Sequence, residues 1–179
     1  MSRVQLRAVL SRAIARAFPA PRMISIEDHS RTLLAAQGYC ELSMFEEAIA
    51  ELDSLPSSAQ QHPAAVELRL LVLMQARRWR PALAAGRELT QIAPDRSSGF
   101  IHAAFCLHEL GKTAEARTLL MSGPETLHAE PVYYYNLACY ECVLGNVEVA
   151  RVHLEKSVQL DKKFRDYART DPDLKALRA

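Results

Sequence analysis

The sequence predicts an all-α protein in which helical hairpins stack into a solenoid. Four alanines carry the period, because Ala48, Ala82, Ala116 and Ala150 recur in one constant 34-residue register. A fixed period of roughly 20–50 residues is the sequence signature of a repeat architecture. Composition agrees, since only 6 of the 179 residues are glycine and alternating β-branched residues are scarce. We therefore expect helices and no sheet.

Each alanine lies in a similar local pattern, which indicates two helices joined by a turn. In the last copy, Leu137 and Ala138 lie on one helical face, and Gly145 ends the helix. Gly111 precedes the third alanine by the same number of residues as Gly145 precedes the fourth. A small residue at a helix crossing lets two backbones approach closely, while an aromatic residue such as Trp79 fills the neighbouring groove.

Prolines mark the expected ends of several helices. Pro63 and Pro131 stand where a first helix begins, a position at which the missing N–H has no helical partner in any case. Pro94 follows a second helix, which it cannot continue.

The stretch from Tyr135 to Asn146, Tyr-Asn-Leu-Ala-Cys-Tyr-Glu-Cys-Val-Leu-Gly-Asn, resembles the tetratricopeptide repeat (TPR) family, in particular its small bacterial members. The resemblance covers about residues 29–162. It implies a right-handed α-solenoid of about four helix-turn-helix units with a C-terminal capping helix. The units are expected at residues 29–62, 63–96, 97–130 and 131–164, within a TPR domain of residues 23–162.

Three positions depart from the family pattern. Ser43 and Arg77 stand where the first and second turns would carry glycine. Gly123-Pro124 interrupts the second helix of the third copy, so we expect that repeat to be irregular.

The two ends of the chain differ from the repeats. Residues 161–179 predict a cap, since Phe164, Tyr167 and Ala168 are spaced to cover the apolar face of the last repeat. Residues 1–22 are rich in arginine and end at Pro19-Ala-Pro21. Three interpretations stay open for them: a helix on the first repeat or in the groove, a targeting segment, or an extension before a natural start at Met23.

Charge and hydropathy exclude several function classes. The net charge is +1, but five arginines precede the first acidic residue, Glu27, and the remainder of the chain carries a net −4. We therefore expect no nucleic-acid partner. No apolar run approaches the ~20 residues of a membrane-spanning helix, so no membrane partner is expected. Four cysteines within apolar helical patterns suit a reducing, cytoplasmic location.

The TPR resemblance also implies a binding surface. In that family, one face of each first helix lines a concave groove that holds ligands. In this chain the face is largely apolar and carries Leu33, Leu34, Gln37, Leu68, Leu71, Met74, Ile101, His102, Phe105, His108, Tyr135, Asn136, Cys139 and Cys142. Leu71, Met74, Phe105 and Tyr135 are expected to form its continuous apolar strip. A face this apolar must be buried by a ligand, a second subunit, the N-terminal helix or the neighbouring repeats.

We therefore predict a non-enzymatic adaptor or chaperone-like module that binds a partner protein through apolar anchors. The alternatives are a self-associating structural subunit, which would form a homo-oligomer, and a zinc- or redox-responsive module. The last would use Cys139 and Cys142, but this C-x-x-C lies within a helix and has no second pair.

Two further motifs are coincidental matches. Leu110-Gly-Lys-Thr113 ends like a phosphate-binding loop, but Cys106 replaces its first glycine. His108-Glu109 begins like a zinc-protease helix, but Lys112 occupies the second histidine position. We expect no catalytic residues, no metal and no cofactor.

Overall fold

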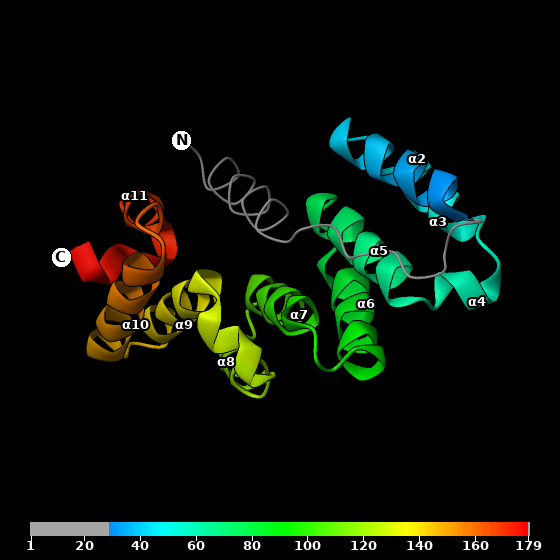
Figure 1. Ribbon diagram of the computed structural model, residues 1–179. Helices are drawn as coiled ribbons and strands as arrows, with labels where there is room; N and C mark the ends of the chain where they lie inside the picture. The colour runs from blue at the N-terminus through cyan, green and yellow to red at the C-terminus, as the bar shows by residue number, and fades with distance from the viewer. Residues whose placement is uncertain (1–28, 179) are drawn as a thin grey trace.

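The computed structural model describes residues 29–178, and they form a row of antiparallel helix pairs (Figure 1). The first helices of the four repeats are α2 (Ser30–Glu41), α5 (Pro63–Gln75), α7 (Ser97–Glu109) and α9 (Pro131–Val143). Their second helices are α3 (Phe45–Asp53), α6 (Trp79–Ile92), α8 (Thr113–Met121) and α10 (Val147–Leu160). Shorter elements follow some of them: α4 (Ser57–Gln60), η2 (Glu125–Ala129), α11 (Phe164–Ala168) and η3 (Pro172–Arg178). This part of the chain contains no strand. The fold class predicted from the sequence, an α-solenoid, is confirmed.

The turns inside the four repeats share one geometry. Ser43, Arg77, Gly111 and Gly145 have φ values of 62°, 59°, 78° and 86°, and they follow the same 34-residue register as the alanines. In each turn the next residue donates its backbone N–H to the carbonyl five positions earlier, at 2.8–2.9 Å. Left-handed backbone of this kind suits glycine at a helix C-terminus. Ser43 and Arg77 adopt the same turn despite their side chains.

The four alanines that define the period are buried as predicted. Ala48, Ala82, Ala116 and Ala150 are all 0% exposed. Each lies in the first turns of a second helix, where that helix packs on its own first helix. The lack of a longer side chain is what allows the two helices to approach.

Replacing Ala150 by Leu should therefore overpack the contact between α9 and α10. We expect the free energy of unfolding to fall by about 1–3 kcal/mol, because a packed core accommodates extra methylenes only by shifting its neighbours. Guanidinium titration followed by circular dichroism measures this loss. A variant with the parent's unfolding midpoint would show that position 150 is not at a tight crossing.

Second helices occur in two lengths. α6 and α10 have 14 residues each, whereas α3 and α8 have 9. The break after α8 was predicted from Gly123-Pro124. A Cβ on Gly123 would collide there with the side chain of Leu127. The break after α3 was not predicted, although Pro56, which cannot continue a helix, follows it closely.

The C-terminal segment corresponds to a fifth first helix that is broken in its middle. In the 34-residue register, Tyr167 matches Tyr133 and Leu174 matches Tyr140. Pro172 interrupts the helix, so α11 and η3 form separate turns. η3 packs mainly on α9, and Leu174 is 0% exposed there. The ring of Phe164, in α11, lies 5.0 Å from the ring of Tyr135.

The predictions for residues 1–22 lie outside the described residues. Among the helices of residues 29–178, none is long and apolar enough to cross a lipid bilayer.

Candidate protein-binding surface

The residues predicted to line the groove fall into three groups in the structure. The first group lies on α2 and α5, two neighbouring first helices. Leu34 is 66% exposed, Gln37 is exposed, and Leu68 and Leu71 are half-buried. We call Leu34, Gln37, Leu68 and Leu71 the concave strip, after the face of the first helices on which the TPR resemblance places them. Three of its four members are apolar, and none is charged.

The second group is buried in the repeat core. Phe105 is 8% exposed and belongs to the same apolar cluster as Met74. The ring of Phe105 makes an edge contact with Trp79 of the preceding repeat, with the ring centroids 5.9 Å apart. Leu33 and Ile101 are likewise buried. Met74 and Phe105 therefore do not form the accessible apolar strip that was expected of them with Leu71 and Tyr135, because they are packed in the core between the second and third repeats.

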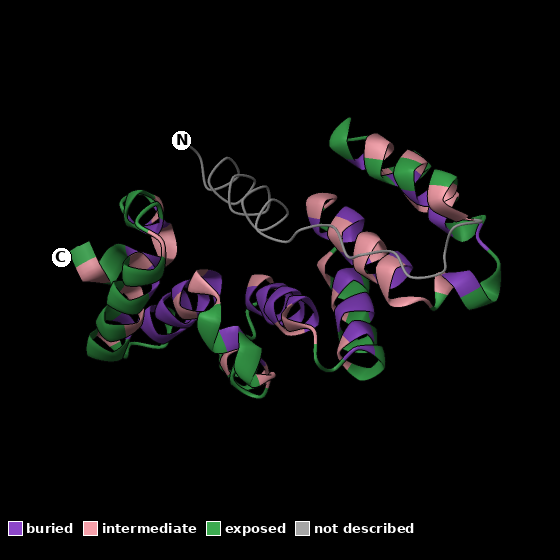
Figure 2. Ribbon diagram, in the orientation of Figure 1, coloured by how far each residue is buried: buried purple, intermediate pink, exposed green. Residues whose placement is uncertain are grey.

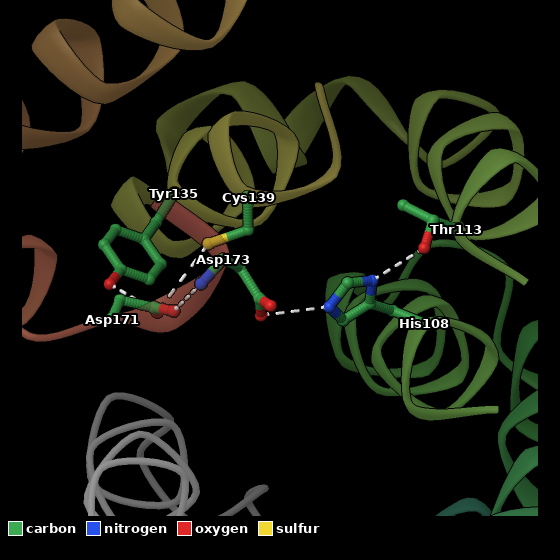
Figure 3. A network of polar contacts seen from close by, with 6 residues as sticks. All are labelled: His108, Thr113, Tyr135, Cys139, Asp171 and Asp173. Atoms are coloured by element: carbon green, nitrogen blue, oxygen red, sulfur yellow. Dashed lines mark hydrogen bonds and ion pairs between the residues drawn. The ribbon is translucent and has the colours of Figure 1, made fainter. Parts of the chain in front are cut away.

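The third group is covered by the C-terminal segment (Figure 3). The Tyr135 hydroxyl donates a hydrogen bond to Asp171 Oδ2 at 2.8 Å, and Cys139 Sγ lies 3.8 Å from the same oxygen. Asp171 also accepts from the backbone N–H of Asp173, at 2.9 Å. Cys142 lines a pocket together with Pro172 and Asp173. These positions are thus occupied by the chain itself.

His108 connects this third group to the third repeat. Its Nε2 lies 3.1 Å from Asp173 Oδ2, within hydrogen-bond distance. Its Nδ1 lies 3.0 Å from Thr113 Oγ1, and the ring stacks at a tilt on Tyr140. Sequence reasoning placed His108 in the groove but missed Asp171 and Asp173. The signal that could have found them is Asp-Pro-Asp at the break of the fifth first helix.

Burial shapes the electrostatics of this region. It raises the pKa of Tyr135, and the neighbouring Cys139 and Asp171 raise it further. Burial also lowers the pKa of His102 to about 4, so this ring is neutral at pH 7. Asn136, in the same register position on α9, is 6% exposed. These polar groups of the expected groove therefore lie inside the protein.

The cysteines are buried thiols. Burial raises the pKa of Cys40 to about 11 and that of Cys106 to about 12, and it also raises the pKa of Cys139. All four are free, and residues 29–178 contain no cluster of three or more His, Cys, Asp or Glu side chains that could hold a metal ion.

We predict that none of the four thiols reacts with Ellman's reagent near pH 8 in the native protein, since burial suppresses both access and the thiolate. All four should react after unfolding in guanidinium. Changing Cys139 to Ala together with Cys142 to Ser should leave the helical circular dichroism spectrum intact. Stoichiometric zinc in the purified protein, or unfolding by a chelator, would contradict this assignment.

The comparisons with known proteins show the fold alone. No family model and no curated protein matches the sequence. Among solved structures, residues 41 to the end of MamA from Desulfovibrio magneticus RS-1 superpose with a TM-score of 0.70 at 15% identity, covering 84% of this chain and 85% of that one. A double mutant of RS-1 MamA gives a TM-score of 0.65 at 13% identity and covers 91% and 97%. MSR-1 MamA gives 0.64 at 14% identity and covers 90% and 93%. MamA is a TPR-like protein, so this chain has a TPR-like helical repeat fold.

Proposed function

We propose that this protein is a non-enzymatic binding module that holds a segment of another protein against the concave strip. One observation carries the proposal. Leu34, Leu68 and Leu71 stay accessible on two adjacent first helices, whereas their counterparts in the third repeat, His102 and Phe105, are buried. An exposed leucine with two half-buried leucines on the neighbouring helix of a repeat scaffold fits a partner-binding surface.

The chemistry of the strip defines the partner. The strip holds no cation, so it lacks the groups that would clamp an acidic tail. Gln37 donates a hydrogen bond from Nε2 to Glu41 at 3.0 Å, which places a polar group beside the leucines. The partner segment should therefore present two or three apolar side chains at helical or extended spacing.

The expected affinity is modest. Burial of one leucine side chain contributes about 1.5–3 kcal/mol. Association costs several kcal/mol in lost rigid-body freedom and side-chain ordering. Two or three inserted side chains contribute about 3–9 kcal/mol in total. After the association cost we expect weak binding, with a Kd closer to about 1 mM than to about 1 μM, which suits a transient adaptor or chaperone-like role. Four free cysteines support a reducing compartment, and we propose the cytoplasm.

Selection of peptides from a random display library tests the proposal before any natural partner is identified. Selected peptides should be rich in apolar residues. The double change Leu34→Glu and Leu71→Glu should weaken their binding by at least roughly tenfold, or about 1.4 kcal/mol, because charges would replace the apolar contacts. Val152→Glu is the matched control, since Val152 is 64% exposed on α10. Equal affinity for the parent and the double variant would place the binding site elsewhere.

A further inference from the structure

The second and third repeats of this solenoid stack through a close contact between α6 and α7. Gly86 on α6 faces Ala103 on α7, and a Cβ added to Gly86 would stand 2.9 Å from the Cβ of Ala103. Gly99 on α7 faces Thr90 on α6, and a Cβ added to Gly99 would stand 3.1 Å from the backbone nitrogen of Thr90. A second helix therefore presents positions 86 and 90 to the next first helix, which presents positions 99 and 103.

The same stripe lies open at the start of the repeat array. The stripe of α7 also includes Cys106 and Leu110, and its counterparts two repeats earlier are Arg31, Ala35, Gly38 and Leu42. We call these four residues the head stripe. Cys106 is 0% exposed, whereas a Cβ added to Gly38 would have nothing within 4 Å. Leu42 is 72% exposed. No described helix covers this side of α2, so the head stripe is a stacking face without a neighbour among the described residues.

The complementary face lies open at the other end of the array. The counterparts of Gly86 and Thr90 two repeats later are Leu154 and Val158 on α10. Both line a pocket of about 640 Å³, together with Leu174 and Leu177 of the broken fifth helix. We call this space the tail pocket. In an inner repeat the next first helix fills this position, but here η3 packs mainly on α9.

Charge separates the two faces. Among the residues that the structure describes, the tail pocket is bordered by one carboxylate, that of Glu155, and by five cations. The cations are Arg151, Lys162, Arg165, Arg169 and Arg178. Lys162 and Arg165 are exposed and make no ion pair with another described residue. Residues 30–53, which carry the head stripe, have a net charge of −4 from five carboxylates and Arg31. Arg31 lies on the stripe itself, and Asp53 and Glu46 pair with Arg69 and Arg78 of the second repeat. Figure 2 shows many exposed residues on α2 and on α10, at opposite ends of the row.

We propose that the head stripe of one copy docks into the tail pocket of a second copy, so that the solenoid continues from molecule to molecule. The contact has the same register as the stacking of α7 on α6, and the opposite net charges of the two end segments favour a head-to-tail direction. The two faces of the contact differ, so the interface is heterologous and generates rings or filaments instead of closed two-fold dimers. The contact uses neither Leu68 nor Leu71 of the concave strip, whereas Leu34 lies one helical turn from Gly38 and borders both surfaces.

Sedimentation velocity on the full chain tests the proposal with two variants. Gly38→Arg places a long cation in the open space on the head stripe and replaces glycine by a better helix former, so its melting temperature should not fall. Lys162→Glu with Arg165→Glu reverses two exposed charges at the tail pocket. The parent should form species larger than a dimer as its concentration rises, and about 0.5 M salt should weaken them relative to about 0.05 M.

Each variant alone should remain monomeric, and an equimolar mixture of the two should form a dimer and nothing larger. The mixture distinguishes a head-to-tail interface from other modes of association. The Gly38→Arg variant keeps an intact tail pocket and the charge-reversed variant keeps an intact head stripe, so one such contact can form per pair. A parent that stays monomeric into the millimolar range overturns the proposal, as does a Gly38→Arg variant that associates like the parent. Loss of association in Leu71→Glu, with Gly38→Arg unaffected, would instead assign the contact to the concave strip.

Discussion

Changing Phe105 to Glu should destabilise the protein by about 3–5 kcal/mol, because it places a carboxylate without a partner in the core. Phe105 is 8% exposed and packs edge-on against Trp79, among the apolar side chains of the second and third repeats. The substitution removes this ring contact and adds the cost of burying a charge. Guanidinium titration should show a much lower unfolding midpoint.

Leu71→Glu is the matched control for this prediction. Leu71 occupies the same register position as Phe105, one repeat earlier, but it is half-buried. Its substitution should therefore cost about 1 kcal/mol or less. If Phe105→Glu unfolds at the same midpoint as Leu71→Glu, Phe105 faces the solvent and the core assignment is mistaken.

Leu174→Ala should cost about 2–5 kcal/mol, the range for truncating a fully buried leucine. Leu174 is 0% exposed and lies in the apolar cluster that holds Tyr135 and Tyr140. The loss should appear as a lower melting temperature and as faster hydrogen exchange in α9, since η3 covers that helix.

Leu160→Ala provides the comparison for the C-terminal segment. Leu160 ends α10 and is 42% exposed, so its truncation should change the stability by about 0.5 kcal/mol at most. Equal melting temperatures for Leu174→Ala and the parent would mean that η3 does not pack on α9. The C-terminal segment would then be a free tail, and Tyr135 and Cys139 would be open to a partner.

The repeat could be predicted from the sequence because its determinants are local. A crossing needs a small residue, and the 34-residue register of Ala48, Ala82, Ala116 and Ala150 fixes where each crossing falls. The turn inside each repeat needs one residue with positive φ. Glycine adopts that conformation readily, so Gly111 and Gly145 mark the turn in the sequence. Ser43 and Arg77 show that the stacking of the helices imposes the same turn without glycine.

The accessible surface could not be predicted in the same way, because it depends on residues far away in the chain. Periodicity assigns Leu71 and Phe105 to the same helical face, but Phe105 is packed against Trp79 in the apolar cluster of the second and third repeats, whereas Leu71 is half-buried. Tyr135 is covered because Asp171, 36 residues later, accepts its hydrogen bond. Helical spacing reports which residues share a face, whereas burial depends on what packs against that face.

Photo-crosslinking tests the central claim, that a partner segment binds the concave strip, most directly. A benzophenone amino acid would replace Leu71 in one sample and Val152 in another, and each would be irradiated with a peptide selected for binding. We predict crosslinks from position 71 to the apolar residues of the peptide and none from position 152, which lies on the solvent side of α10. Crosslinking at position 152 but not at position 71 would contradict the claim and place the binding surface outside the concave strip.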